Sequence, residues 1–338
     1  MTSPAIPLRL RVAALFTALL LLSCVVTACQ SPASTPVSRQ TFLLDTVVKI
    51  TIYEGGGAQE IADAFALCRR YEDMLSRTKP DSEIARLNAR TTTQVSDETA
   101  VLIQLGLTYA ALSNGALDIT IAPVSTLWDF RAKPPRLPDN GAIAAALTHV
   151  GWQKVTVDGN TITFADEHTQ LDLGAIAKGY IADRLKESLV AAGVTRALIN
   201  LGGNIQCIGQ KSATEAFSVG IQRPFADSVI AVAAVADISM VTSGVYERCF
   251  RLEDTLYHHL LDPQTGYPAA NDLLSVTIFC ANSAQADALS TACFVLGRDT
   301  ATALIDSLEG VHAVFITDDY RVHLTKDFRE AIPISITP

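Results

Sequence analysis

Charged and aromatic residues are both scarce in this chain, at 18% and 7% of its 338 residues, and positive charge is the scarcer sign. The formal net charge of −9 argues against general nucleic-acid binding through a basic surface. No CxxC pair occurs, and five of the seven cysteines are scattered inside apolar segments. We therefore expect small buried cysteines rather than a disulfide framework, with a single bridge left open. A GxGxxG run that opens a helix is also missing, which excludes the usual dinucleotide fingerprint.

Only one long apolar run is present, and it lies at the N-terminus. Arg9 and Arg11 precede Val12 to Leu22, which is shorter than the roughly 18 residues that a membrane-spanning helix needs. Small residues then lead from Val26 into Cys29. This pattern predicts a bacterial lipoprotein signal over residues 1–28 with a lipid on Cys29. Leu22-Ser23-Cys24 is an alternative cleavage box. A third possibility is a chain that is not cleaved, or one that is secreted without a lipid.

A stretch rich in Ser, Pro and Thr follows, and it predicts a flexible stalk over residues 29–40. The folded domain is then expected over residues 41–338. This organisation predicts an exported protein that is lipid-anchored to a cell membrane and faces the periplasm or the cell exterior.

Helical and strand-like patterns follow one another without strict alternation, and no internal repeat is present. Strands are expected at 41–53, 197–201, 274–280 and 313–317, a hairpin at 154–164, several strands within 217–261, and helices at 58–75, 96–113, 177–192, 283–296 and 300–308. The mixture favours an α+β architecture, as one large domain or two intimately packed lobes, over a doubly wound parallel sheet.

Four stretches are unusually polar or glycine-rich for their positions, and they are residues 115–120, 171–179, 198–204 and 259–266. In the second, Asp172, small residues and Lys178 precede a predicted helix, which suits a phosphate cradle. An ordinary turn with Asp172 as cap and Lys178 in solvent explains it equally well. In the third, Gly202-Gly203 allows close backbone approach to a ligand, or forms a plain hairpin turn.

The fourth stretch begins at His259, directly after His258. Histidines in such positions are more often structural than catalytic. A further pattern lies in the helix predicted at 283–296, where Asp287 and Thr291 share one face at i and i+4. Hard oxygen ligands at that spacing suit Mg²⁺. The alternative is a capping aspartate and a threonine hydroxyl bonded back to its own helix.

Each of these signals is weak alone, but the order of the motifs and their amino-acid sequences resemble one family closely. The matching runs are SEI with LN (82–88), GALDITIAPVSTLWDF (115–130), LDLGAIAKGYIAD (171–183), INLGGN (199–204), VTSGVYER (241–248), HLLDPQTGYP (259–268) and ADALSTACFVLG (286–297). Together they resemble the ApbE family, the FAD:protein FMN transferases, from Thr41 onward. The resemblance implies mixed sheets and helices in two packed lobes with the cofactor site between them.

It also implies an activity, in which FMN is transferred from FAD to a threonine or serine hydroxyl of a target protein and AMP is released, with Mg²⁺ required. Flavin-accepting membrane respiratory or electron-transfer subunits would be the targets. The residues carried over as metal ligands are Asp287, Thr291 and the Ala175 carbonyl. Those expected at the FAD site are Thr78, Ala116, Leu117, Asp118, Asp172, Lys178 and His259. His259 is the candidate for positioning or deprotonating the incoming hydroxyl, with Asp287 as an alternative base.

The chain departs from the family pattern at three places, of which the replacement of FDxT by Leu117-Asp118-Ile119-Thr120 is mild because it keeps the carboxylate and the hydroxyl. Leu44-Asp45-Thr46 stands where many members carry Met-Gly-Thr, and Thr78 stands where some carry an aromatic residue over the flavin. Flavin stacking is therefore expected to be weaker or differently supplied. Two other functions remain open at this point: an FAD pyrophosphatase that uses water as the acceptor, and a flavin-binding lipoprotein without catalysis.

Overall fold

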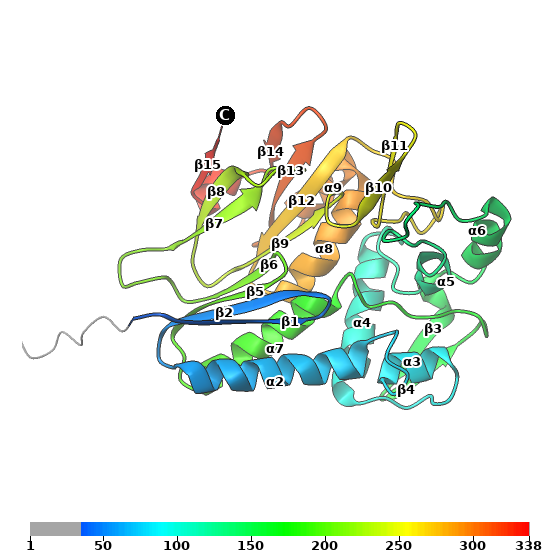
Figure 1. The fold of residues 1–338 in the computed structure, drawn as a ribbon, viewed down its shortest axis with the longest axis horizontal. Coiled ribbons are helices and arrows are strands. Elements are labelled where there is room, and N and C mark those ends of the chain that lie inside the picture. Colours follow the sequence, from blue (N-terminus) through cyan, green and yellow to red (C-terminus); the bar gives the residue numbers. More distant parts are fainter. Residues whose placement is uncertain (1–34, 338) are drawn as a thin grey trace, which may run out of the picture. The chain divides into compact units, whose positions relative to one another are not determined.

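An antiparallel sheet of eight strands organises the protein in a computed structural model that describes residues 35–337 (Figure 1). The predicted signal and Cys29 lie outside the described residues. In spatial order the strands are β1 (Val37–Leu43), β2 (Thr46–Glu54), β5 (Arg196–Leu201), β6 (Asn204–Ile208), β9 (Ser239–Gly244), β12 (Leu273–Cys280), β13 (His312–Thr317) and β14 (Val322–Leu324).

The central strands of this sheet are buried on both faces. In β12, Ile278 packs into one hydrophobic cluster while its neighbour Phe279 packs into another on the opposite face. This follows from the period of two along a strand, which sends successive side chains to opposite sides. A second sheet of three strands, β15 (Ile334–Ile336), β8 (Val229–Val235) and β7 (Phe217–Gln222), contributes to the cluster around Phe279.

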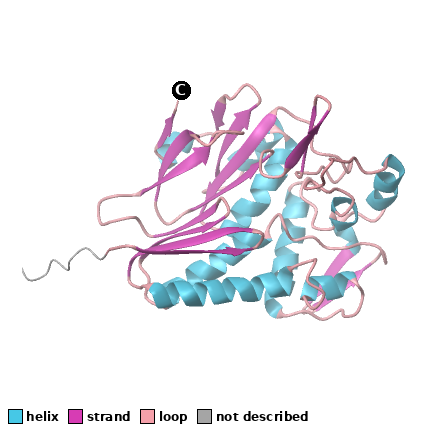
Figure 2. Cartoon of the chain, viewed as in Figure 1, coloured by secondary structure: helices cyan, strands magenta, loops and turns pink. Residues whose placement is uncertain are grey.

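Helices pack on the other face of the large sheet, as Figures 1 and 2 show. They are α2 (Ala58–Leu75), α3 (Glu83–Asn88), α4 (Asp97–Leu112), α7 (Ala177–Ala191), α8 (Ser283–Leu296) and α9 (Arg298–Asp306). Helix α2 buries Ile61, Ala64, Cys68, Tyr71 and Leu75, a spacing that forms a single apolar stripe. Ser96 caps α4 by accepting the backbone N–H of Thr99, as its sequence predicted.

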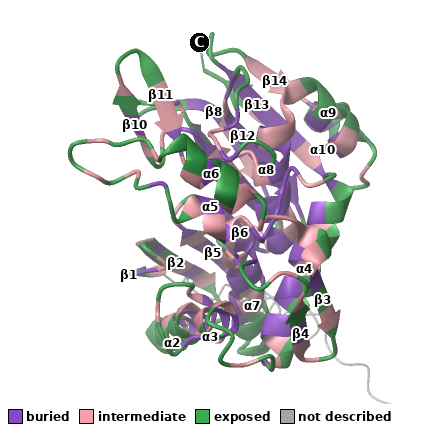
Figure 3. Ribbon diagram, turned by 90° about the vertical axis from the view of Figure 1, so that its right-hand side faces the viewer, coloured by how far each residue is buried: buried purple, intermediate pink, exposed green. Residues whose placement is uncertain are grey.

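The remaining elements are short. They are α5 (Ala122–Ser125), α6 (Asn140–Leu147), the 3-10 turn η1 (Trp152–Lys154), α10 (Phe328–Ala331), and the hairpins β3 (Val155–Asp158) with β4 (Thr161–Phe164) and β10 (Cys249–Leu252) with β11 (Thr255–His258). Figure 3 shows α6 largely exposed, whereas α8 and the central strands are buried.

The α+β class is confirmed. Residues 37–337 form one compact unit, so the expected lobes are parts of one domain. Two boundaries differ from the prediction. The segment 41–53 is a hairpin rather than one strand, because Leu44 and Asp45 form its turn. Residues 37–40, assigned to the stalk, belong to β1, because they pair in register with Lys49 to Ile52 of β2.

The cysteines behave as their apolar surroundings predicted. Cys68, Cys207, Cys280 and Cys293 are buried thiols, Cys249 is partly exposed, and all five are free within the described residues. Among residues 35–337, no helix combines the length and the hydrophobicity that crossing a bilayer requires.

Candidate active site

A cleft of about 720 Å³ opens beside the ends of several elements. Its lining comes from the β1–β2 turn, the segment 116–131, the start of α7, the β5–β6 turn, the end of β9 with the loop after it, residues 259–263, and α8. Three hydrophobic clusters meet at its wall, since Leu117 belongs to one, Leu260 to a second and Trp128 to a third. The cleft therefore lies between separately packed parts of the domain.

Nearly all residues predicted for the site lie on this cleft. Its lining includes Ala116, Leu117, Asp118, Asp172, Ala175, Lys178, His259, Asp287 and Thr291. Thr78 is the exception: it is exposed outside the cleft, where its hydroxyl lies 3.1 Å from the Ser76 hydroxyl. The neighbouring side chain, Arg77, lines the cleft instead.

Helices α7 and α8 are joined through two buried aspartates, each of which accepts backbone N–H groups near the start of the other helix. Asp183 of α7 accepts the N–H groups of Ser283 and Ala284 at 2.8 and 2.9 Å, which would otherwise be unpaired at the start of α8. Asp287 of α8 accepts the N–H of Gly179, near the start of α7, at 2.8 Å. Each helix therefore fixes the beginning of the other.

This exchange leaves oxygen atoms available in the cleft. No backbone N–H within the described residues donates to the Ala175 carbonyl, because the N–H of Gly179 is used by Asp287. The Thr291 hydroxyl contacts Ser243 Oγ at 3.2 Å rather than its own helix, and Asn282, not Asp287, caps α8. Asp287 therefore does not cap its own helix, and the Thr291 hydroxyl does not bond back to that helix.

These atoms form an all-oxygen donor set that fits Mg²⁺. Within residues 35–337, no three His, Cys, Asp or Glu side chains gather into a metal site, so Asp287 would be the one carboxylate in this set. Mg²⁺ commonly takes one or two carboxylates and completes its shell with substrate phosphates and water. Asp287, Thr291 and the Ala175 carbonyl match that pattern.

Burial raises the pKa of Asp287, and the positive charge of Lys178 and the Gly179 N–H oppose the increase. Lys178 is the one cationic side chain on the cleft without a carboxylate within 4.0 Å among the described residues. Its ammonium group therefore has no carboxylate within that part of the chain that an anionic ligand would have to displace, and the alternative of a solvated Lys178 stays open.

Asp172 does not cap α7, since the N-cap is Ile176 and no side chain caps it. One carboxylate oxygen accepts the Gly174 N–H at 3.0 Å, and the other pairs with Arg77 Nε and the Ser125 hydroxyl, each at 3.1 Å. Asp172 therefore holds the turn before α7 in place at the edge of the cleft.

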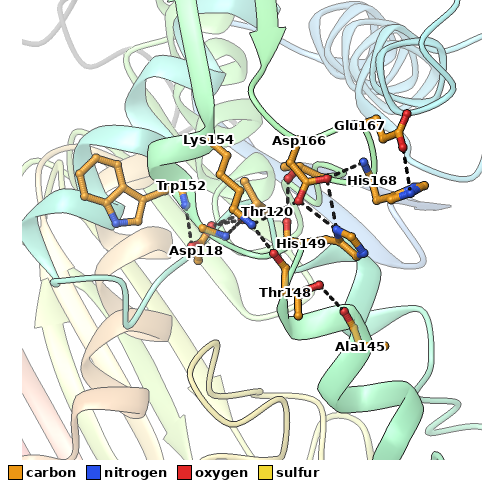
Figure 4. Close-up of polar contacts among 12 residues, drawn as sticks. Asp118, Thr120, Ala145, Thr148, His149, Trp152, Lys154, Asp166, Glu167 and His168 are labelled. Atoms are coloured by element: carbon orange, nitrogen blue, oxygen red, sulfur yellow. Dashed lines mark hydrogen bonds and ion pairs between the residues drawn. The ribbon is translucent and has the colours of Figure 1, made fainter.

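Asp118 is buried, and its carboxylate is turned toward its own chain (Figure 4). It accepts the Thr120 hydroxyl at 2.6 Å and the Trp152 N–H at 2.9 Å. Burial raises the pKa of Asp118, and these donors oppose the rise. The carboxylate thus shapes the loop that presents Ala116 and Leu117 to the cleft.

Figure 4 also shows a second polar cluster beside Asp118. In this cluster Asp166 pairs with His149 at 2.9 Å and with Lys154 at 3.3 Å. His149 lowers the pKa of Asp166. None of these three residues lines the cleft.

A separate cavity of about 310 Å³ is lined by His258, whereas His259 lines the cleft, so these two adjacent histidines face different spaces.

His259 lines the cleft, and its Nδ1 is buried without a hydrogen-bond partner in the described part of the chain. Burial, with a smaller contribution from the charge of Arg248, lowers the pKa of His259 to about 3. The imidazole is therefore neutral at physiological pH and can accept a hydrogen bond.

We expect the His259 ring to remain neutral between pH 8 and about pH 5, because its folded-state pKa lies below that range. Ring ¹⁵N chemical shifts measured across this range should show one neutral tautomer. Arg248→Gln should raise the pKa, since it removes a nearby positive charge. Protonation of wild-type His259 near pH 6.5 would contradict the assignment.

Several cleft residues were not identified from the sequence. Asp45 lines the cleft and forms ion pairs with Arg131 and Arg248, which also line it, and Arg77 pairs with Asp172. Asp45 and Arg248 stand inside stretches that the resemblance covers, but nothing in their spacing links them, because 203 positions separate them.

Comparisons with known proteins agree with this geometry. The model of the ApbE family matches residues 44–315. An FAD:protein FMN transferase of Treponema pallidum is 36% identical over 309 residues, 84% of this chain and 85% of the relative. One from Klebsiella pneumoniae is 35% identical over 272 residues, 78% of this chain and 84% of the relative.

Solved structures show the same architecture. The ApbE protein of Thermotoga maritima superposes with a TM-score of 0.81 at 29% identity, covering 88% of this chain and 99% of that one. The flavin transferase ApbE of Vibrio cholerae gives 0.79 at 25% identity with the same coverage. The fold, the cleft and these relatives define an α+β transferase. The chain belongs to the ApbE family.

Proposed function

We propose that this protein transfers FMN from FAD to the hydroxyl of a threonine or serine in a target protein and releases AMP. The hydroxyl oxygen attacks the phosphorus of the FMN half, forming a phosphoester, and the bond from that phosphorus to the AMP phosphate oxygen breaks. The hydroxyl proton leaves to a base, and AMP carries away the bonding electron pair.

The observation that carries this proposal is the convergence of Asp287, Thr291, the Ala175 carbonyl, Lys178 and His259 on one cleft of about 720 Å³. Such a volume accommodates a large ligand. Lys178 has no carboxylate partner in the described region, so it supports binding of the pyrophosphate.

His259 supports positioning of the incoming hydroxyl. The ring lines the cleft, and a neutral imidazole keeps one nitrogen that can accept a hydrogen bond from the hydroxyl and orient the oxygen toward phosphorus. Its low pKa makes it a weak base. We therefore assign it to orientation, and the proton to the Asp287 carboxylate or to solvent.

Mg²⁺ would be held by Asp287, Thr291 and the Ala175 carbonyl. When bound, the ion neutralises charge that develops on the phosphates and on the leaving AMP. The acidic character of the chain, with a formal net charge of −9, favours such a counter-charge beside Lys178.

The test is to incubate the protein with FAD, Mg²⁺ and a flavin-accepting respiratory subunit, and to quantify both AMP and acceptor-bound flavin after denaturing electrophoresis. We expect AMP and fluorescent acceptor to appear in equal amounts. Replacing the accepting threonine by valine should abolish labelling.

Two results would contradict the transferase. AMP and free FMN without labelled acceptor would identify an FAD pyrophosphatase, with water as the acceptor. Recovery of intact FAD would identify a flavin-binding protein without catalysis.

We also propose that the protein is exported by the signal at residues 1–28 and anchored through a lipid on Cys29. The support is the sequence pattern of two arginines, an apolar run and small residues before the cysteine. The anchor would keep the cleft close to membrane subunits that accept flavin on the same side.

Cys29→Ser should move the protein from the membrane fraction to the soluble fraction without changing activity on FAD. Metabolic labelling with a radioactive fatty acid should mark the wild type and not this variant. Labelling that persists in Cys29→Ser but is lost in Cys24→Ser would show that the alternative box is used.

A further inference from the structure

Asp45 lies in the turn that joins strands β1 and β2, and Figure 1 shows the hairpin that these two strands form. Leu43 pairs with Thr46, so Leu44 and Asp45 form a two-residue turn, with φ angles of 54° and 60°. Such a turn favours glycine or asparagine, because a Cβ is disfavoured in the left-handed region. The chain places a carboxylate there instead.

The turn is fixed in position from two sides. The Leu44 N–H donates to Glu72 Oε1 of α2 at 2.7 Å. Gly202 donates its N–H to the Val47 carbonyl at 3.2 Å, and a Cβ at Gly202 would collide with the side chain of Thr46. The Asp45 carboxylate is therefore presented to the cleft from a held backbone.

Two guanidinium groups from distant segments meet this carboxylate. Arg131 follows α5 and Arg248 follows β9, and the Nη2 atoms of both reach Asp45 Oδ2, at 3.3 Å for Arg248. All three residues line the cleft. Neither arginine pairs with any other carboxylate in the described part of the chain.

We infer that Arg131 and Arg248 are phosphate-binding groups of the cleft, and that Asp45 occupies them until the substrate displaces it. This inference rests on the proposed function. Two guanidiniums converge on one carboxylate oxygen, and their N–H groups can be accepted in the same way by the oxygens of a phosphate.

The energetic balance permits such an exchange. The side chains of Asp45, Arg131 and Arg248 are 47%, 65% and 49% exposed. Ion pairs at that exposure are weak, so a doubly charged pyrophosphate can replace one carboxylate. Asp45 thus competes with FAD and lowers its apparent affinity, while it keeps the arginines at the cleft.

The test is Asp45→Asn, which keeps the size of the side chain, tolerates the left-handed backbone and removes the charge. FAD binding is measured by calorimetry in EDTA at low and high salt. We expect the variant to bind FAD about three- to tenfold more tightly at low salt, and the gain to shrink at high salt. Riboflavin, which has no phosphate, should bind both proteins equally.

Asp129→Asn is the matched control. It removes the same charge from the same cleft lining, but Asp129 accepts the backbone N–H of Arg131 at 3.0 Å rather than its guanidinium. Its gain in FAD affinity should be clearly smaller. Arg131→Gln in the Asp45→Asn background should reverse most of the gain.

Three results would overturn the inference: FAD affinity unchanged or weaker in Asp45→Asn, an equal gain in Asp129→Asn, or an equal gain for riboflavin. If wild type binds FAD and labels an acceptor while Asp45→Asn shows no gain, the inference fails and the proposed function stands. If wild type does not bind FAD at all, both fail.

Discussion

Replacing Asp287 by asparagine should lower kcat for FMN transfer by about a thousandfold, which corresponds to about 4 kcal/mol of lost transition-state stabilisation. The carboxylate is the charged member of the oxygen set on the cleft, and asparagine cannot supply that charge. The asparagine carbonyl can still accept the Gly179 N–H, so the contact between α7 and α8 is retained. Acceptor labelling at several Mg²⁺ concentrations measures the loss.

The same substitution should leave the free energy of unfolding at neutral pH unchanged or higher. Burial raises the pKa of Asp287 in the folded state. The folded state therefore loses stability as pH rises above the lower pKa of the unfolded chain, and the loss is complete above the raised pKa. A neutral side chain removes this cost. Calorimetry at pH 7 would show a melting temperature equal to or above that of the wild type.

Asp183→Asn is the matched control for this prediction. Asp183 is also buried with a raised pKa, but it accepts two N–H groups and does not line the cleft. Asparagine has one acceptor oxygen, so we expect a loss of about 1 to 3 kcal/mol in stability and most of the activity retained. If Asp287→Asn keeps more than a tenth of wild-type kcat, its assignment to the metal site is wrong.

Gly179→Ala should destabilise the fold by about 3 kcal/mol, which corresponds to a drop of about 6 to 12 °C in Tm. A Cβ at this position would lie 2.6 Å from the carbonyl carbon of Ser283, closer still to its oxygen, and 2.7 Å from the Cβ of Asp287. Two of these atoms are backbone and cannot rotate away. The helices must separate, and FMN transfer should fall with them because Asp287 is displaced.

Gly141→Ala is the control for Gly179→Ala, since it makes the same change in helix α6. There a Cβ meets only the end of the Asp139 side chain, at 3.0 Å. Alanine also favours the helix by about 1 kcal/mol. We expect Tm within a few degrees of the wild type, measured by calorimetry. Equal losses in both variants would show that close contact between α7 and α8 is not the cause.

Local patterns predicted the long elements well. The apolar stripe of α2, the cap of α4 and the Asp158-Gly159-Asn160 hairpin signal depend on neighbours within a few residues, and each has the predicted form. Elements without such markers were missed. The β1–β2 turn has neither glycine nor asparagine, and β6 is five residues long with polar Asn204 and Gln206, both buried.

The alternatives that the sequence left open were decided by contacts between distant segments. Gly202-Gly203 is a hairpin turn between β5 and β6, and Gly202 also lines the cleft. His258 and His259 share almost the same local sequence, yet they face different cavities. The local sequence cannot determine which of two adjacent side chains at the end of a strand faces the cleft.

The sequence by itself determined the family resemblance, the α+β class and which side chains carry oxygen, nitrogen and charge. Tertiary structure alone decided their partners. Asp287 meets the Gly179 N–H across 108 positions, and Asp45 meets Arg131 across 86. Neither pairing follows from a local period, because helix and strand patterns act only over a few residues. Whether a carboxylate caps a helix, binds a metal or holds an arginine depends on which segments the sheet brings together.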